Sequence, residues 1–225
     1  MLSTIRIEEK ILGKNDELAG GNRRLFDASD TFVVTLSGSP GGGKTSLLER
    51  IVPRLRSTLR VAVVEGDVET ERDGQRIAAL GIPVTQIVTN GTCHLNAGMV
   101  ARALDGVDLE EVDLLFLENV GNLVCPASFG LGEHERVIVM STTEGEDKPL
   151  KYPAMFRKAN AMVLNKVDLA PFTPVDMDAF EVYARRVRPG LPVFRTSCTT
   201  DAGIEEWIAW LTGRRQSWLA TRSAR

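Results

Sequence analysis

A glycine-rich segment that ends in lysine and threonine carries the clearest chemistry in this sequence. Residues 38–45 read GSPGGGKT and match the pattern G-x-x-x-x-G-K-[ST], between an apolar run and a helical pattern. Glycine lets backbone N–H groups approach phosphate oxygens, and the start of a helix adds a positive dipole. We therefore expect Lys44 to reach the β- and γ-phosphates of a nucleotide and Thr45 to coordinate magnesium. The predicted phosphate-binding residues are Gly38, Ser39, Pro40, Gly41, Gly42, Gly43, Lys44, Thr45 and Ser46.

A second motif indicates which base the nucleotide carries. Residues 165–168 read NKVD and resemble the N-K-x-D motif that GTPases use for guanine. The Asp168 carboxylate can accept hydrogen bonds from guanine N1–H and the 2-amino group, whereas adenine offers neither pattern on that edge. The segment 196–198 resembles the loop whose backbone contacts the guanine oxygen. The sequence therefore predicts GTP and GDP as ligands, with base contacts from Asn165, Lys166, Asp168, Ser197 and Cys198.

Two further strand ends supply carboxylates. The apolar run Leu114–Glu118 ends in an acid, and Glu118 and Gly121 have the spacing of the D-x-x-G motif of many GTPases. Such an acid commonly lies near magnesium, and the N–H of such a glycine can sense the γ-phosphate. The alternative is a glutamate that simply faces solvent. Asp67 ends another apolar run. We predict Thr45, Asp67 and Glu118 as magnesium ligands, and Lys44, Asp67, Glu118 and Gly121 as the catalytic group.

Two of the three cysteines stand close to other metal-ligating or acidic residues. Cys93 is followed by His94 just after an apolar run, and Cys125 comes shortly after Glu118. Both segments leave the carboxyl ends of predicted strands, so they can meet on the nucleotide side of the sheet. Two thiolates and an imidazole form a soft site suited to zinc or nickel, which a second copy of the chain could complete. The alternative is that the cysteines fill the core, as free cysteines often do.

These groups need a scaffold that brings strand ends together. From Thr31 onward, short apolar runs alternate with helical patterns, which is typical of an α/β fold with a mostly parallel sheet and helices on both faces. In such sheets, ligands bind beyond the carboxyl ends of the strands, where the motifs fall. The expected strands are Phe32–Ser37, Val61–Glu65, Val84–Thr89, Leu114–Glu118, Val137–Ser141, Ala161–Asn165 and Val193–Thr196. The expected helices are Lys44–Leu55, Asp73–Leu80, Ala97–Leu104, Ala154–Lys158, Pro174–Val187 and Gly203–Leu211.

Two terminal segments flank the predicted nucleotide-binding domain at residues 31–213. Residues 1–30 are expected to form a helix, which Gly20-Gly21 weakens or bends, and whose apolar stripe packs on the domain or forms a dimer contact. The stripe consists of Ile11/Leu12, Leu18/Ala19 and Leu25/Phe26. Residues 214–225 are basic and are interpreted as a solvated tail. His134 is interpreted as a surface residue.

Composition limits the class of protein. A chain of 225 residues with 43% hydrophobic and 25% charged residues is typical of one globular domain. Its net charge of -3 gives no strong positive field for nucleic acid or anionic lipid. No apolar run approaches the roughly 20 residues that cross a bilayer, and residues 1–10 lack the apolar core of a signal peptide. We therefore expect a cytoplasmic protein with no nucleic-acid or membrane partner.

Together, these motifs resemble those of the HypB family, the GTPases that help insert nickel into nickel–iron hydrogenases. The resemblance runs from about Ile11 to Leu211, and its most specific segments are SPGGGKTSLLER at 39–50, VEGD at 64–67, CHLNA at 93–97 and ENVGNLVCP at 118–126. It implies a fold of the SIMIBI class of nucleotide-dependent dimerising proteins. It also implies a nickel or zinc site at the dimer interface, carried by Cys93, His94 and Cys125. The implied partners are a second copy, bound in a GTP-dependent manner, hydrogenase maturation proteins and the hydrogenase large subunit.

The chain also departs from the family pattern. No cysteine precedes Cys93 and only two histidines are present, so we do not expect high-capacity nickel storage. Asn96 replaces an aspartate that is common after Cys-His-Leu, which can alter the surroundings of the metal. Gly38 stands where many members have serine, without harm to phosphate binding. The resulting hypothesis is a GTP-hydrolysing metallochaperone that binds nickel or zinc and delivers nickel to hydrogenase. The alternatives are a GTP-regulated dimer with a structural zinc site, and a P-loop kinase acting on a small molecule.

Overall fold

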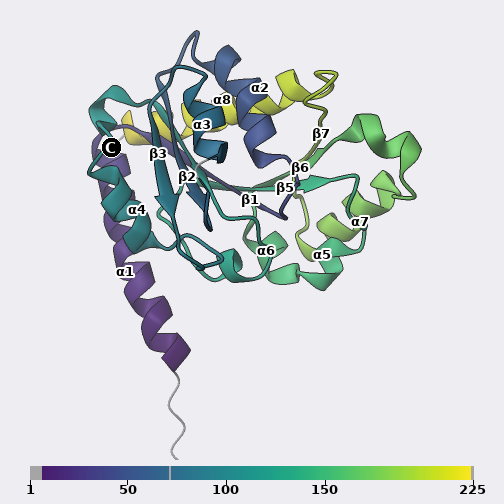
Figure 1. The fold of residues 1–225 in the computed structure, drawn as a ribbon, viewed down its shortest axis with the longest axis horizontal. Coiled ribbons are helices and arrows are strands. Elements are labelled where there is room, and N and C mark those ends of the chain that lie inside the picture. Colours follow the sequence, from purple (N-terminus) through teal and green to yellow (C-terminus); the bar gives the residue numbers. More distant parts are fainter. Residues whose placement is uncertain (1–6, 71, 224–225) are drawn as a thin grey trace, which may run out of the picture.

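A seven-stranded sheet forms the centre of the protein. The computed structural model describes residues 7–70 and 72–223. Within these residues the strand order is β3-β2-β4-β1-β5-β6-β7, and every strand pair is parallel (Figure 1). The predicted α/β fold is confirmed, and all carboxyl ends of the strands lie at one edge. The strands are β1 (Phe32–Gly38), β2 (Val61–Asp67), β3 (Val84–Val88), β4 (Leu114–Glu118), β5 (Glu135–Ser141), β6 (Ala161–Asn165) and β7 (Val193–Arg195).

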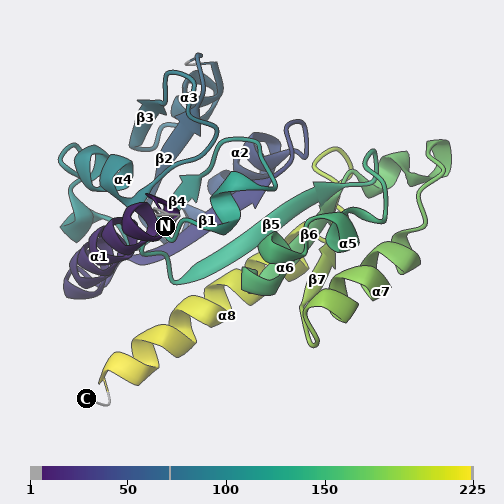
Figure 2. The same ribbon diagram turned by 90° about the horizontal axis from the view of Figure 1, so that it is seen from below.

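Helices cover both faces of the sheet, as predicted (Figure 2). One face packs against α2 (Lys44–Leu55), α3 (Arg72–Ala78) and α8 (Ile204–Ser223). The other face packs against α1 (Ile7–Ala28) and α4 (Ala97–Leu104) near β2 and β4, and against α6 (Pro153–Lys158) and α7 (Met177–Val187) near β5 and β6. None of the helices in the described ranges combines the length and apolar character that crossing a bilayer requires. The shorter elements are α5 (Lys148–Lys151), η1 (Leu109–Glu111), η2 (Cys125–Ala127) and η3 (Val167–Phe172).

Strand β1 shows why unbroken apolar runs identified the strands. All of its residues are buried. Val34 and Leu36 join the core on the α2 side, whereas Val33 joins the core on the α1 side. Because successive side chains point to opposite faces, a strand covered on both faces needs apolar residues at nearly every position.

Helix α1 docks through two asparagines as well as through part of its apolar stripe. Asn15 accepts a hydrogen bond from Ala97 N at 2.9 Å, and Asn22 donates to Ala97 O and Leu131 O at 3.0 Å. Of the predicted stripe, Phe26 is fully buried, whereas Ile11, Leu18 and Leu25 are exposed. The helix continues through Gly20-Gly21 without interruption, so the predicted weak point does not break it. Residues 1–6 of the predicted N-terminal segment lie outside the described residues.

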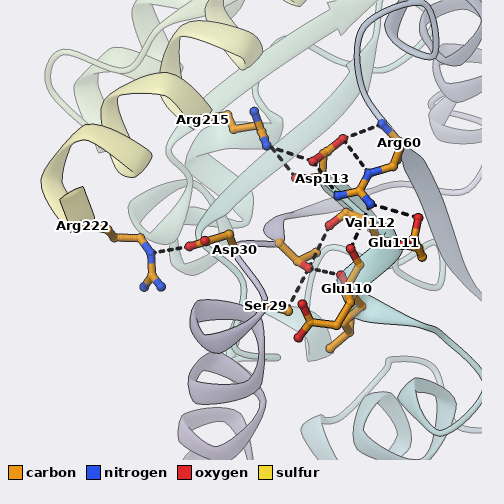
Figure 3. A network of polar contacts seen from close by, with 11 residues as sticks. Ser29, Asp30, Arg60, Glu110, Glu111, Val112, Asp113, Arg215 and Arg222 are labelled. Atoms are coloured by element: carbon orange, nitrogen blue, oxygen red, sulfur yellow. Dashed lines mark hydrogen bonds and ion pairs between the residues drawn. The ribbon is translucent and has the colours of Figure 1, made fainter.

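The basic residues Arg214, Arg215 and Arg222 belong to α8 and do not form a solvated tail, while residues 224–225 of the predicted tail lie outside the described residues. The predicted boundary at residue 213 falls inside this helix, which continues to Ser223. Arg215 contacts the Asp113 carboxylate at 3.3 Å, and Arg222 contacts Asp30 at 3.0 Å (Figure 3). The interpretation as a tail was wrong because these acidic partners lie far away in the sequence and satisfy the basic side chains only after folding.

His134 is buried, so its interpretation as a surface residue was also wrong. Its side chain is 3% exposed. Its Nδ1 accepts a hydrogen bond from Val33 N at 2.9 Å, and its Nε2 lies 3.1 Å from the Asp27 carboxylate. The ring packs edge-on against Trp218 of α8. Burial lowers the pKa of His134 to about 4, so the imidazole is neutral at physiological pH.

We predict that His134 makes stability depend on pH between about 6.5 and 4. The pKa of an unperturbed imidazole is 6.5, against about 4 in the folded state, so the unfolded chain binds the extra proton in this window. The stabilisation is therefore fully present above pH 6.5 and is lost as the pH falls toward 4, by up to about 3 kcal/mol. Urea unfolding across this range measures the effect. The variant His134→Asn keeps an acceptor for Val33 N but does not titrate, so an equally steep slope in that variant would contradict the assignment.

Candidate functional site

The glycine-rich segment forms a loop between β1 and α2. Gly41 and Gly43 have φ values of 73° and 93°, in the left-handed region that favours glycine. A Cβ atom on Gly43 would lie 2.3 Å from Asn165 Nδ2, so this position also requires the absence of a side chain. Helix α2 begins at Lys44 without a side-chain cap. Its first N–H groups therefore remain available to an anion.

A cavity of about 470 Å³ lies over this loop, a volume typical of a small-molecule site. The structure thus brings most of the phosphate loop together with both predicted strand-end acids. The predicted site residues that line the cavity are Pro40, Gly41, Gly43, Lys44, Thr45, Ser46, Asp67, Glu118, Gly121 and Lys166. The predicted residues that do not line it are Gly38, Ser39, Gly42, Asn165, Asp168, Ser197 and Cys198.

Glu118 faces the phosphate loop and is 3% exposed, so the alternative of a solvent-facing glutamate is wrong. Its Oε1 accepts a hydrogen bond from Thr45 Oγ1 at 2.8 Å, whereas its buried Oε2 has no partner among the described residues. Burial raises the pKa of Glu118 to about 7, an effect that nearby Lys44 opposes. Burial also lowers the pKa of Lys44. An unpartnered buried carboxylate oxygen beside a threonine hydroxyl suits a hard divalent cation.

The cavity holds an acidic cluster that the sequence analysis found only in part. One carboxylate oxygen each from Glu65, Asp67 and Asp73 lies within 4.8 Å of the others. Glu65 is 2% exposed, and burial together with the nearby Glu118 raises its pKa to about 8. Gln86 donates a hydrogen bond to the Glu65 carboxylate. Glu65 had a local signal, because it stands two positions before Asp67 on one strand.

Helix α3 contributes two cavity residues that the sequence analysis missed, Asp73 and Arg76. The Arg76 guanidinium pairs with Asp73 at 2.9 Å and with Glu49 of α2 at 2.6 Å. Arg76 therefore brings a positive charge beside the acidic cluster. No local pattern predicts these roles, because α3 reaches the phosphate loop through its packing against α2, β2 and β3.

The NKVD segment is bound directly to the phosphate loop. Asn165 Nδ2 donates to Gly42 O at 3.3 Å, and Lys166 Nζ donates to Gly41 O at 2.7 Å. Lys166 has a φ of 62°, and this conformation turns the chain from β6 into η3, where the half-buried Asp168 lies. The hydrogen bonds couple the position of this segment to that of the phosphate loop.

The segment after β7 lies against the same asparagine. Cys198 Sγ is 3.5 Å from Asn165 Oδ1, and the Ser197 hydroxyl accepts hydrogen bonds from the next turn. Burial raises the pKa of the Cys198 thiol. Cys198 also lines a second cavity of about 310 Å³, together with Ser46 and Arg50 of α2. The residues predicted for the base thus lie next to those predicted for the phosphates.

Cys93, His94 and Cys125 come together at this edge of the sheet. The two Sγ atoms are 3.0 Å apart, and one ligand atom from each of the three residues lies within 4.8 Å of the others. All three residues are partly exposed, so the alternative that the cysteines fill the core is wrong. Burial lowers the pKa of His94, whose ring packs on Phe129. A lowered pKa favours the neutral imidazole, which is the form that binds metal ions.

Asn96, which departs from the family pattern, caps helix α4. Its Oδ1 accepts a hydrogen bond from Met99 N at 2.9 Å. Asparagine and aspartate are about equally good at this position, so the departure preserves the local structure.

Comparison with known proteins assigns most of the chain to one family. Residues 32–195 match the family described as CobW/HypB/UreG, nucleotide-binding domain. The hydrogenase maturation factor HypB of Azotobacter vinelandii is 51% identical over 218 residues, which cover 97% of this chain and 72% of that protein. HypB of Escherichia coli K12 is 46% identical over 211 residues, which cover 94% of this chain and 73% of that protein.

Two solved structures match nearly the complete fold. HypB of Archaeoglobus fulgidus has a TM-score of 0.85 at 37% identity, with 90% of this chain and 99% of that one covered. HypB of Helicobacter pylori in complex with nickel has a TM-score of 0.87 at 34% identity, with coverage of 91% and 96%. These likenesses confirm the resemblance noted from the motifs, including the SIMIBI class of the fold. With its P-loop nucleotide-binding domain, the chain belongs to the HypB family of hydrogenase maturation factors.

Proposed function

We propose that the chain hydrolyses GTP, binds nickel or zinc, and delivers nickel during hydrogenase maturation. One observation carries the proposal: the nucleotide cavity and the cysteine–histidine cluster share one short segment, residues 118–125. The segment begins with Glu118, which lines the cavity, and ends with Cys125 of the cluster. The relatives support the proposal, because they are named hydrogenase maturation factors and one solved relative holds nickel.

In this proposal the phosphate loop and the NKVD segment hold GTP. The backbone N–H groups of residues 38–46, except Pro40, which has none, and the Lys44 ammonium bind the β- and γ-phosphates and stabilise charge that develops during hydrolysis. Asp168 accepts hydrogen bonds from guanine, and the backbone at Ser197 and Cys198 lies near the guanine oxygen. The N–H of Gly121 senses the γ-phosphate. Water attacks the γ-phosphorus, and GDP and phosphate leave.

The residues present fit a magnesium ion. Thr45 offers a hydroxyl, Glu118 a buried carboxylate oxygen that has no partner in the described part of the chain, and Asp67 a further carboxylate in the same cavity. When bound there, the ion supplies positive charge to the phosphate oxygens. Two further acids, Glu65 and Asp73, lie beside Asp67, and a bound cation favours the ionised form of Glu65, whose pKa burial raises to about 8.

Nickel is the proposed cargo of the cluster. Two thiolates and an imidazole accept either nickel or zinc, and three ligands leave coordination open to a second copy of the chain. The partial exposure of all three residues favours an exchangeable ion over a structural zinc, because structural zinc sites are closed. The NKVD motif favours GTP over the ATP that a small-molecule kinase would use.

The two sites are proposed to act as a switch. GTP orders Asp67 and the segment 118–121 and favours a homodimer, whereas hydrolysis relaxes this segment and passes the metal on. The proposed recipients are hydrogenase maturation proteins and, through them, the hydrogenase large subunit, in the cytoplasm.

Replacing either cysteine should abolish tight nickel binding and leave the protein folded. We expect Cys93→Ala and Cys125→Ala to lose at least about a hundredfold in nickel affinity, because each removes a thiolate ligand. Competition with a chelator measures the affinity, while GTP affinity and the thermal midpoint serve as controls. Collapse of the fold in both variants would instead support a structural zinc.

Replacing Asp168 should weaken guanine recognition. In Asp168→Asn one of the two acceptor oxygens becomes an NH2 donor, so one of the two guanine donors loses its partner and faces a second donor; GTP affinity should fall by about a hundredfold or more and ATP affinity should not. Nucleotide competition measures both. Asp176→Asn is a matched control, because Asp176 caps α7 outside the site and asparagine caps equally well. Unchanged GTP preference in Asp168→Asn would refute the base assignment.

Binding of magnesium and GTP should release protons near neutral pH. The pKa values of Glu118 and Glu65 are about 7 and about 8, mainly because of burial, and a bound cation favours their ionised forms. Apparent affinity should therefore rise with pH between about 6 and 8. Calorimetry at pH 7 in two buffers of different ionisation enthalpy counts the protons. Glu118→Gln should release fewer protons, and the absence of any release in the parent protein would exclude this linkage.

A further inference from the structure

The loop that carries Cys93 and His94 is tied to the segment after β4 by two asparagine side chains. Asn119 is 2% exposed, and its Oδ1 accepts a buried hydrogen bond from Leu95 N at 2.9 Å. Asn122 Nδ2 donates to Cys93 O at 3.3 Å. The backbone on both sides of His94 is therefore held by residues that follow β4.

The same segment is bound to the start of the phosphate loop. Asn122 N donates to Gly38 O at 2.9 Å, and these two residues form an isolated antiparallel bridge. Gly121 lies so close to Pro40 that a Cβ atom on it would be 2.9 Å from Pro40 Cα. The segment cannot shift at Gly121 without disturbing either the phosphate loop or the bonds that Asn122 makes.

The other side of the Cys93 loop packs on the acidic end of β2. Leu95 is fully buried, and a Cβ atom on Gly66 would lie 2.6 Å from Leu95 Cδ2. Gly66 stands between Glu65 and Asp67, and all three line the nucleotide cavity. The loop is thus held between two elements that both end in the nucleotide cavity.

We propose that Asn122 is a positioning residue that transmits the nucleotide state to the Cys93 half of the metal cluster. Cys125 follows Asn122 three positions later in the chain. Cys93 lies on a different loop, which contacts this segment through noncovalent interactions. The bond from Asn122 to Cys93 O fixes the backbone of Cys93 beside Cys125 and so preorganises the pair for a metal ion. When the segment moves away from Pro40, this bond breaks and Cys93 loses its position.

This inference rests on the proposed function, in which the nucleotide changes metal affinity. The hydrogen bond from Asn122 to Cys93 O raises metal affinity only in the nucleotide state that preserves this bond. Removing this hydrogen bond should lower the affinity for the metal ion in that nucleotide state and leave the affinity in the other state nearly unchanged. The ratio of the two dissociation constants should therefore approach one.

The variant Asn122→Asp separates the donor of this side chain from its acceptor; the Asn122 side chain also contacts the Cys125 thiol. Aspartate keeps an oxygen for Val124 N, which Asn122 Oδ1 accepts at 2.8 Å, but it cannot donate to Cys93 O. Asn122→Ala removes the bonds to Cys93 O and from Val124 N together with the contact to Cys125. Asn96→Ala is the matched control, because it removes the cap of α4 beside the same loop and leaves the hydrogen bond from Asn122 to Cys93 O intact.

The experiment measures the dissociation constant of Ni²⁺ with GDP and with a non-hydrolysable GTP analogue in all four proteins. In the parent the two constants should differ by roughly 5–150-fold, the usual range of coupling between sites. Both Asn122 variants should reduce this ratio at least about threefold, and Asn96→Ala should keep it. By linkage, nickel should change the affinity for the GTP analogue by the same factor, and this reciprocal effect should shrink in parallel.

Each outcome decides the inference. Asn122 variants that keep the parent ratio would overturn it and leave the proposed function standing, even if their thermal midpoints fall. Equal nickel affinities with both nucleotides in the parent would overturn both. If the ratio of the two nickel dissociation constants also fell in Asn96→Ala, the role of Asn122 would be overturned, because any disturbance of the loop would then be enough to uncouple the two sites.

Discussion

All seven strands run in the same direction, and the rest of the molecule depends on this constraint. Every loop that leaves the carboxyl end of a strand must arrive at the same edge of the sheet. The phosphate loop follows β1, acids end β2 and β4, the Cys93 loop follows β3, and the NKVD segment follows β6. Groups far apart in the sequence therefore meet within one small region. The opposite edge holds structural contacts instead, such as those of His134 and Arg222.

Ionisable side chains line the cavity at this edge of the sheet. Four carboxylates, from Glu65, Asp67, Asp73 and Glu118, face one cavity in which Lys44 is largely buried. Glu65 and Glu118 lie side by side across β2 and β4, and burial raises the pKa of each into the neutral range. In the proposed function, such a cavity favours a nucleotide triphosphate that is accompanied by a cation over a bare one, because the cation offsets the repulsion between carboxylates and phosphates.

The cluster of Cys93, His94 and Cys125 is built on the same elements as the nucleotide cavity. Close packing of Gly121 on Pro40 and of Leu95 on Gly66 leaves little space between the two sites. Packed interfaces of this kind move between discrete arrangements and do not deform continuously. A change in the phosphate loop thus has short physical routes to both cysteines, along the chain to Cys125 and through asparagine side chains to Cys93.

The sequence by itself determined the features whose chemistry lies in consecutive residues. The phosphate loop, the NKVD segment, the strand-end acids and the seven strands all follow from local patterns, because backbone geometry and alternating burial act over a few positions. Tertiary structure alone decided the rest. His134 and Asp27 are 107 positions apart, Arg222 and Asp30 are 192 apart, and Asn119 and Leu95 are 24 apart. No local pattern reveals a partner at such a distance, because burial and hydrogen bonding of these side chains exist only once the helices have packed on the sheet.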